Sequence, residues 1–75
     1  MTSQAHTVIL VYSTSYALRV EKLLRKAGIP SRLIPVPRHL SSDCGVCLRI
    51  AQTDRDAAQR ALQEGGVEIE GIHGI

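Results

Sequence analysis

The chain contains no tryptophan and no phenylalanine, and Tyr12 and Tyr16 are its only large aromatic side chains among 75 residues. Proteins that bind single-stranded nucleic acids usually stack bases on aromatic side chains within a basic groove. No apolar run approaches the roughly 20 residues that a membrane-spanning helix needs. We therefore expect neither a nucleic-acid partner nor a membrane.

The chain also has little excess of positive over negative charge, because its formal net charge is only +2. Hydrophobic residues make up 44% of the chain and charged residues 21%, which is typical of a soluble globular protein. A chain of this length forms one domain, residues 1–75, with a modest core, since it buries only about 60% of its unfolded surface. The first residues lack the basic start and apolar stretch of a secretory signal, so we expect a cytoplasmic location.

Hydrophobic periodicity predicts the elements of the first two thirds of the chain. Residues 6–12 are a continuous apolar run, typical of a strand buried on both faces. An amphipathic pattern then predicts a helix that ends at Gly28. Residues 31–36 read as a second strand, which Pro35 restricts to a sheet edge. In a third strand, Val46–Ala51, the side chains of Val46, Leu48 and Ile50 alternate with those of Cys47, Arg49 and Ala51.

The residue pattern in the last third of the sequence predicts one more helix and one more strand. Thr53 and Asp56 resemble a capping box at the start of the helix, and Gly65 with Gly66 ends it. Residues 67–70 alternate like a last strand. The order predicts an α+β fold, a ferredoxin-like βαββαβ sandwich: a four-stranded antiparallel sheet with two helices on one face and its first and third strands central. We expect Val11 and Leu33 on the uncovered face, where they would favour a homodimer.

Cys44 and Cys47 are the only cysteines. They could carry sulfur, form a redox pair or bind a metal. Thioredoxin-like motifs place C-x-x-C at the start of a helix, whereas this pair leads into a strand. A metal site would need two further ligands, of which His39 is the nearest. Two cysteines can also be small apolar residues that fill space, Cys47 above all.

The neighbours of Cys44 favour thiol chemistry. Gly45 leaves room for a substrate. Arg38, His39 and Arg49 could supply positive charge that favours a thiolate, while Asp43 opposes it. The hydroxyls of Ser41 and Ser42 can donate hydrogen bonds to a sulfur anion or to the outer sulfur of a persulfide.

Several pieces of sequence in a fixed order resemble one family over nearly the whole chain. They are Tyr-Ser-Thr at 12–14 with Ala17 and Leu18, Glu-Lys-Leu-Leu at 21–24, Ala-Gly-Ile-Pro at 27–30, Leu-Ile-Pro-Val-Pro-Arg at 33–38, Ser-Ser-Asp-Cys-Gly at 41–45, Leu48 with Arg49, and Val-Glu-Ile-Glu-Gly-Ile at 67–72. The chain resembles a small bacterial family of selenium/sulfur carrier protein-like domains, known mainly as a domain of unknown function.

The resemblance implies that Cys44 is the family cysteine, surrounded by Pro37, Arg38, Ser42 and Gly45, with Arg49 downstream. The position of Cys47 is more usually a small aliphatic residue in this family, which favours a carrier that works with one cysteine.

We therefore expect a carrier of sulfur or selenium that is not an enzyme and uses no cofactor. A donor enzyme would load Cys44 with a persulfide-type adduct, an acceptor protein would receive the cargo, and Cys47 could assist release by forming a disulfide. The side chains or backbone of Arg38, Ser42, Gly45 and Arg49 would bind the substrate. Two alternatives stay open: a ligand-binding or protein-interaction module that uses the open sheet face, and a cysteine-based metal-binding module. No carboxylate pair, catalytic triad or phosphate loop indicates turnover chemistry.

Overall fold

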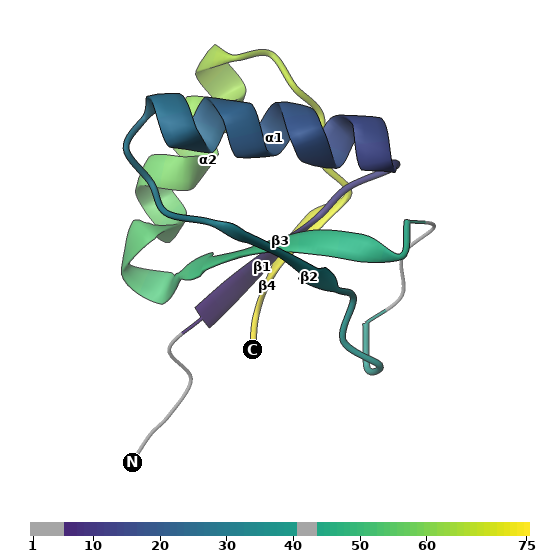
Figure 1. The fold of residues 1–75 in the computed structure, drawn as a ribbon. Helices are drawn as coiled ribbons and strands as arrows, with labels where there is room; N and C mark the ends of the chain where they lie inside the picture. The colour runs from purple at the N-terminus through teal and green to yellow at the C-terminus, as the bar shows by residue number, and fades with distance from the viewer. Residues whose placement is uncertain (1–5, 41–43) are drawn as a thin grey trace.

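Four antiparallel strands form one open sheet in the computed structural model, which describes residues 6–40 and 44–75 (Figure 1). The strands are β1 (His6–Leu10), β2 (Arg32–Pro35), β3 (Val46–Ala51) and β4 (Gly71–Gly74), and they lie in the order β2-β3-β1-β4. The first and third strands are therefore central, as predicted, and Pro35 lies in an edge strand. A proline is tolerated there because it has no N–H to donate to a second neighbour.

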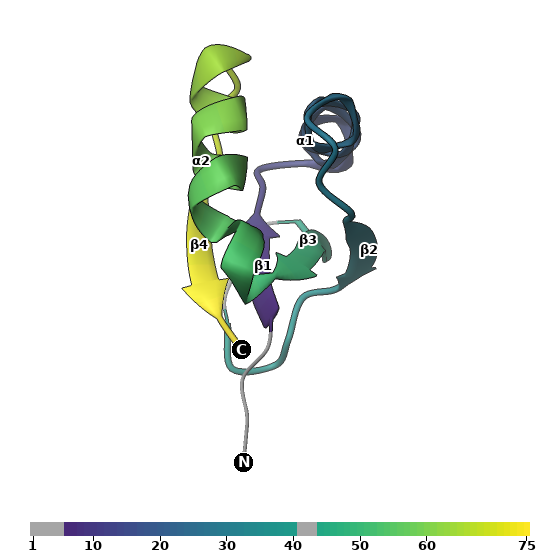
Figure 2. The same cartoon turned by 90° about the vertical axis from the view of Figure 1, so that its left-hand side faces the viewer.

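Two helices, α1 (Thr14–Lys26) and α2 (Arg55–Glu64), lie on the same face of this sheet (Figures 1 and 2). The predicted α+β class, with both helices on one side of an antiparallel sheet, is confirmed. The other side of the sheet carries no helix among the described residues, and we refer to it as the open face.

Both helices end in the same way, which the glycines make possible. Gly28 follows α1 with φ 78° and Gly66 follows α2 with φ 67°, in the left-handed region that glycine adopts without strain. After α1, the Ile29 N–H donates to the Leu24 carbonyl (2.8 Å). After α2, the Val67 N–H donates to the Leu62 carbonyl (3.3 Å). These six-to-one hydrogen bonds are Schellman motifs, so the predicted helix ends are confirmed.

The largest core lies between the sheet and the helices, and we call it the helix-side cluster. Its buried residues are Ile9, Val11, Ala17, Val20, Leu24, Ile29, Cys44, Leu48, Ile50, Ala58 and Leu62. The alternating side chains of β3 point as predicted, because Leu48 and Ile50 belong to this cluster, Val46 packs against it, and Cys47 lies on the opposite face.

A second, smaller core lies on the open face, and we call it the open-face cluster. It consists of Val8, Leu10 and Cys47, against which Ile34, Val36, Leu40 and Ile75 pack. The alternating residues of β1 thus enter the two clusters in turn, which confirms a strand buried on both faces.

The expectation that Val11 and Leu33 lie on the open face is wrong. Val11 is fully buried in the helix-side cluster. Leu33 is the register partner of Leu48, so it lies on the helix side of the edge strand, where it is 38% exposed. The apolar residues that do lie on the open face are largely covered by the chain itself, and they do not form the bare patch on which the homodimer prediction was based.

Two predicted boundaries in the last third of the chain are also wrong. The last strand is β4, Gly71–Gly74, and residues 67–70 belong to the connection before it. The Val67 N–H is used by the end of α2, and Val67 and Ile69 pack on the helix-side cluster from this connection. Thr53 does not cap α2 either, since it lies inside the 3₁₀ helix η1 (Gln52–Asp54) and Asp54 is the N-cap residue.

Candidate functional site

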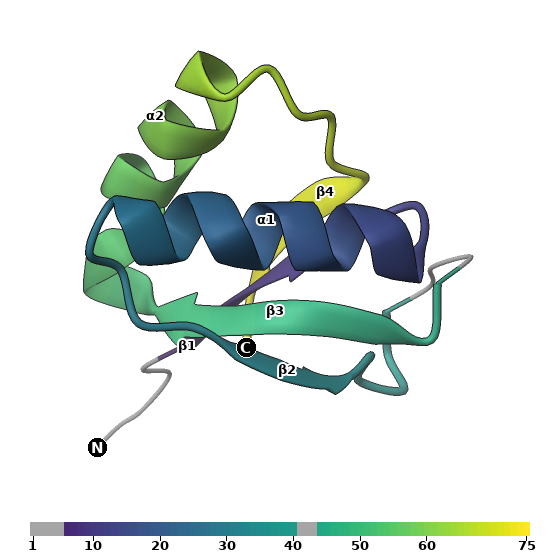
Figure 3. The same ribbon diagram turned by 45° about the horizontal axis from the view of Figure 1, so that its top comes forward.

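The start of β3 and the amino end of α1 lie at the same end of the molecule (Figures 1 and 3). Cys44 lies two residues before β3. The Val36 N–H donates to the Gly45 carbonyl (3.2 Å), which extends the β2–β3 ladder one pair beyond the strands and positions the backbone next to Cys44. The thiol is therefore held at the end of a central strand.

Cys44 belongs to the helix-side cluster and exposes only 6% of its surface. Ala17, in the first turns of α1, and Val11, just before α1, belong to the same cluster. The first turn of α1 contains no acidic side chain, so nothing there neutralises the positive end of the helix dipole.

Cys47 lies on the other side of the sheet, fully buried in the open-face cluster. Burial raises the pKa of the Cys47 thiol above its ordinary value of 9.0, and a negative charge on Cys44 raises that pKa further. No disulfide joins the two cysteines, and their side chains enter clusters on opposite faces of the sheet. Cys44 and Cys47 thus occupy different environments despite their short spacing.

The other predicted site residues lie in three places. Arg38 and His39 are exposed in the turn after β2, where the Leu40 N–H donates to the Pro37 carbonyl (3.0 Å). Gly45 is exposed, and a side chain there would meet nothing within 4 Å. Ser42 lies outside the described residues, as do Ser41 and Asp43.

Arg49 lies further along β3 and on the opposite face from Cys44. Its register partners are Val8 on β1 and Arg32 on β2, which places its side chain on the open face. Three residues of strand, about 10 Å, separate it from Val46, and Cys44 lies two residues further back. The structure therefore does not bring Arg49 and Cys44 together.

The connection from β1 to α1 also lies at the end of the molecule where β3 begins (Figures 1 and 3). The Tyr16 N–H donates to the Ser13 hydroxyl (3.4 Å), which caps α1. The rings of Tyr12 and Tyr16 pack edge to face with centroids 5.9 Å apart. Tyr12 is 47% exposed, so this end of the molecule carries an exposed aromatic side chain. The connection from β1 to α1 reaches this end because β1 pairs with β3, which no local pattern encodes.

Two further observations describe the residues at 6–40 and 44–75. No group of three histidine, cysteine, aspartate or glutamate side chains among them is arranged to hold a metal ion. None of their helices has the length and apolar character needed to cross a bilayer.

The structure thus defines a small α+β domain with one cysteine in the helix-side cluster and a second cysteine buried on the opposite face of the sheet. The model of the family described as "Putative Se/S carrier protein-like" matches residues 6–74. The chain belongs to this family, as its sequence pieces predicted. No curated protein and no solved structure matches the chain.

Proposed function

We propose that this protein is a carrier that accepts sulfur or selenium on Cys44 and passes it to an acceptor protein. The observation that carries the proposal is the family match over residues 6–74, which includes Cys44 at the end of the β2–β3 ladder. The name of the family supports the cargo, and the resemblance of the sequence at 41–45 to the family's cysteine motif supports Cys44 as the residue that carries it.

Loading requires a thiolate at Cys44 and a persulfide on the donor enzyme. The Cys44 sulfur attacks the outer sulfur of the donor persulfide, and the bond between the two donor sulfurs breaks. The donor leaves as a thiolate, and the proton stays on the transferred sulfur, which now forms the persulfide of Cys44. Delivery is the same exchange in the other direction, with an acceptor thiolate as the attacking group.

Cys44 acts alone in this proposal, and Cys47 is a structural residue. Cys47 points into the opposite cluster, and its raised pKa keeps it protonated at neutral pH. A protonated thiol is a poor nucleophile, so Cys47 does not attack the adduct on Cys44.

The low exposure of Cys44 would protect a persulfide on this residue, but it also limits the access of a donor or acceptor to the sulfur. At 6% exposure, a persulfide on this residue is shielded from water and from small thiols that would remove its outer sulfur. A donor or acceptor must therefore displace local structure to reach the sulfur, which a local opening of this end of the domain provides. The partners in this account are proteins rather than free small thiols, and we propose that exchange takes place in the cytoplasm.

We also assign the fold to the ferredoxin-like class. The assignment is supported by the βαββαβ order and by an antiparallel sheet in which β1 and β3 are central.

Mass spectrometry of the protein after incubation with a cysteine desulfurase and cysteine, without reductant, tests the proposed function. The peptide that contains Cys44 should gain one sulfur atom in the parent and in a Cys47→Val variant. Cys44→Ser should gain none. Loading of Cys44→Ser to the level of the parent, or no loading of any variant by desulfurases that load other carriers, would refute the proposal.

A further inference from the structure

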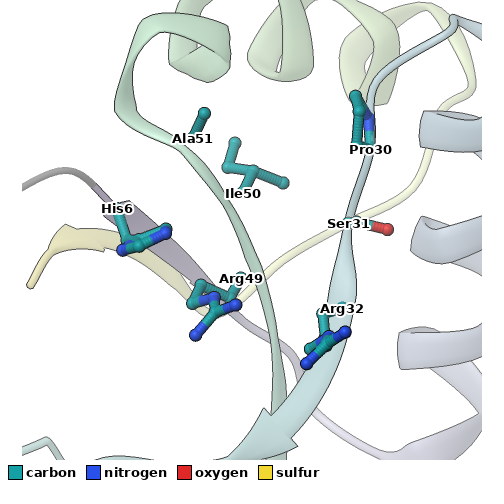
Figure 4. Close-up of a pocket in the computed structure, with 7 residues that line it drawn as sticks. All are labelled: His6, Pro30, Ser31, Arg32, Arg49, Ile50 and Ala51. Carbon is teal, nitrogen blue, oxygen red and sulfur yellow. The ribbon is translucent and has the colours of Figure 1, made fainter.

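A second candidate site lies on the open face, at the end of β3 that is remote from Cys44. It forms a shallow pocket of about 370 Å³, lined by His6, Pro30, Ser31, Arg32, Arg49, Ile50 and Ala51 (Figure 4). The volume lies within the range of small-molecule sites in proteins. None of the residues that line the pocket is acidic.

The register of the sheet brings the basic side chains of this pocket together. Arg32 on β2 and Arg49 on β3 are direct cross-strand partners, so their side chains leave the same face of the sheet side by side. His6 on β1 is the partner of Ala51, two residues along β3, which makes His6 a diagonal neighbour of Arg49. Figure 4 shows the Arg49 guanidinium between the His6 ring and Arg32.

This arrangement is unfavourable without a ligand. Like charges directly opposite each other in a sheet destabilise the pair. Within residues 6–40 and 44–75, the one ion pair joins Arg25 to Glu21 on α1, so neither Arg32 nor Arg49 has a carboxylate partner there. Two guanidinium groups that face one pocket with no counter-charge form a site that an anion would stabilise.

We propose that this pocket binds a dianionic, tetrahedral oxyanion group, such as the phosphate group of a small ligand, through the guanidinium groups of Arg32 and Arg49. A single carboxylate needs only one guanidinium for a bidentate pair, whereas a tetrahedral dianion can accept hydrogen bonds from two. No tryptophan, tyrosine or phenylalanine lines the pocket, which favours a small ligand over a nucleic-acid strand. The proposal is independent of sulfur transfer, since Cys44 lies at the opposite end of β3 and on the other face.

Titration of the labelled protein with inorganic phosphate, followed by amide chemical shifts at constant ionic strength, tests this site. Saturable shifts should be centred on Ser31, Arg32, Arg49 and Ala51 and absent at Gly45. Sulfate should produce the same pattern and acetate should not. Acetate that binds as tightly as phosphate, or shifts spread over all exposed basic residues, would overturn the proposal.

Variants separate this site from general attraction to a basic surface. Arg32→Gln and Arg49→Gln should each weaken phosphate binding about ten-fold or more, because each removes charged hydrogen bonds to the ligand. Arg49→Lys should also weaken binding, since lysine keeps the charge but cannot form the bidentate contact. Arg38→Gln, an exposed arginine in the turn after β2, is the control and should bind like the parent. Equal affinity in all four variants would overturn the proposal.

The melting temperature of Arg49→Gln distinguishes a ligand-binding role of Arg49 from a purely structural one, because loss of a structural residue would lower it. Without phosphate, Arg49→Gln should unfold at the same temperature as the parent or slightly higher, because it removes a like-charge repulsion. At the same high phosphate concentration, the parent should gain more stability than Arg49→Gln, since tighter binding to the folded state raises the melting temperature further. A clear loss of stability in Arg49→Gln without phosphate would show that Arg49 is a structural residue. Loading of Cys44 should be unchanged in Arg32→Gln, so failure of either proposal can be recognised separately.

Discussion

Cys44 and Cys47 are separated by two residues, yet they lie in the two different cores of this domain. Cys44 belongs to the helix-side cluster and lies two residues before β3. Cys47 lies in the middle of the ladder, between Leu10 on β1 and Ile34 on β2, in the open-face cluster. Cys44 lies in a bend before β3 and Cys47 lies within the strand, so the chain between them is not one regular element. A C-x-x-C sequence therefore does not by itself make a dithiol site.

The two clusters also differ in what covers them. The helix-side cluster is closed by α1 and α2, whereas the open-face cluster is closed by four side chains from an edge strand, the turn after it and the last residue. The predictions below test this difference between the two cores, beginning with the largest expected effect.

Leu48→Ala and Leu10→Ala compare the two cores directly. Leu48 is fully buried beneath the helices, and Leu10 is almost fully buried on the open face. We expect Leu48→Ala to lower the free energy of unfolding by about 4 kcal/mol and Leu10→Ala by about 2 kcal/mol, because the thinner cover of the open face can collapse into the cavity. Urea denaturation of both variants measures the difference. Equal losses would show that the two cores are equally rigid.

Cys47→Ser tests the structural role of the second cysteine. The serine hydroxyl would be buried among Val8, Leu10 and Ile34 without a hydrogen-bond partner of its own, which costs about 2 kcal/mol. Cys47→Val keeps the apolar character at similar volume and should change the stability by less than about 1 kcal/mol. If serine were tolerated as well as valine in chemical denaturation, Cys47 would not be a core residue.

The pH dependence of stability provides a separate test of Cys47. Its pKa in the folded protein is raised by burial above the ordinary value of 9.0 that applies in the unfolded chain. Above pH 9.0 the unfolded chain releases this proton while the folded protein retains it, so stability falls as the pH rises until the pH passes the raised pKa. The slope from this one group is at most about 1.4 kcal/mol per pH unit.

The Cys47→Val variant provides the matched control for this titration. The fall in stability above pH 9.0 should be smaller in the variant than in the parent, because the lysine and tyrosine titrations are common to both proteins. Parallel curves for the two proteins would mean that Cys47 has no raised pKa.

Thr7→Val is expected to have the smallest effect and the opposite sign. Thr7 is fully buried, and its hydroxyl oxygen has no hydrogen-bond partner among the described residues. Valine has nearly the same shape, so its introduction should raise the free energy of unfolding by about 1 kcal/mol. A loss of stability in thermal or chemical unfolding would indicate that the hydroxyl binds an internal water molecule.

The central part of the fold could be predicted from the sequence because the local signals agree there. The apolar run of β1, the alternation of β3 and the glycine that ends α1 each correspond to one structure only, and β3 has the predicted bounds. Pro35 identified an edge strand from its missing N–H alone.

The last strand could not be predicted in the same way. Gly71–Gly74 contains two glycines and one histidine and has little tendency to form a strand by itself. It forms β4 because Ile72 pairs with Ile9 at the edge of β1, which is a tertiary interaction. The alternation at residues 67–70 arises instead from a connection that lies over the helix-side cluster.

In the two candidate sites, too, some features could be predicted from the local sequence and others depend on how the strands pair. The sequence indicated Cys44 as a candidate site residue, whereas the opposite faces of Cys47 and Arg49 relative to Cys44 depend on the register of the sheet. The juxtaposition of Arg32 and Arg49, which are 17 positions apart in the sequence, has no local signal at all.

The most direct test of the single-cysteine account is delivery of sulfur from the Cys47→Val variant. The variant is loaded by a desulfurase, separated from the donor and mixed with an acceptor protein thiol, and the sulfur on the Cys44 peptide and on the acceptor is then followed by mass spectrometry. We predict that sulfur leaves Cys44 and appears on the acceptor at the rate seen with the parent. If the variant were loaded normally but retained its sulfur, release would require Cys47 and the account of Cys44 acting alone would be contradicted.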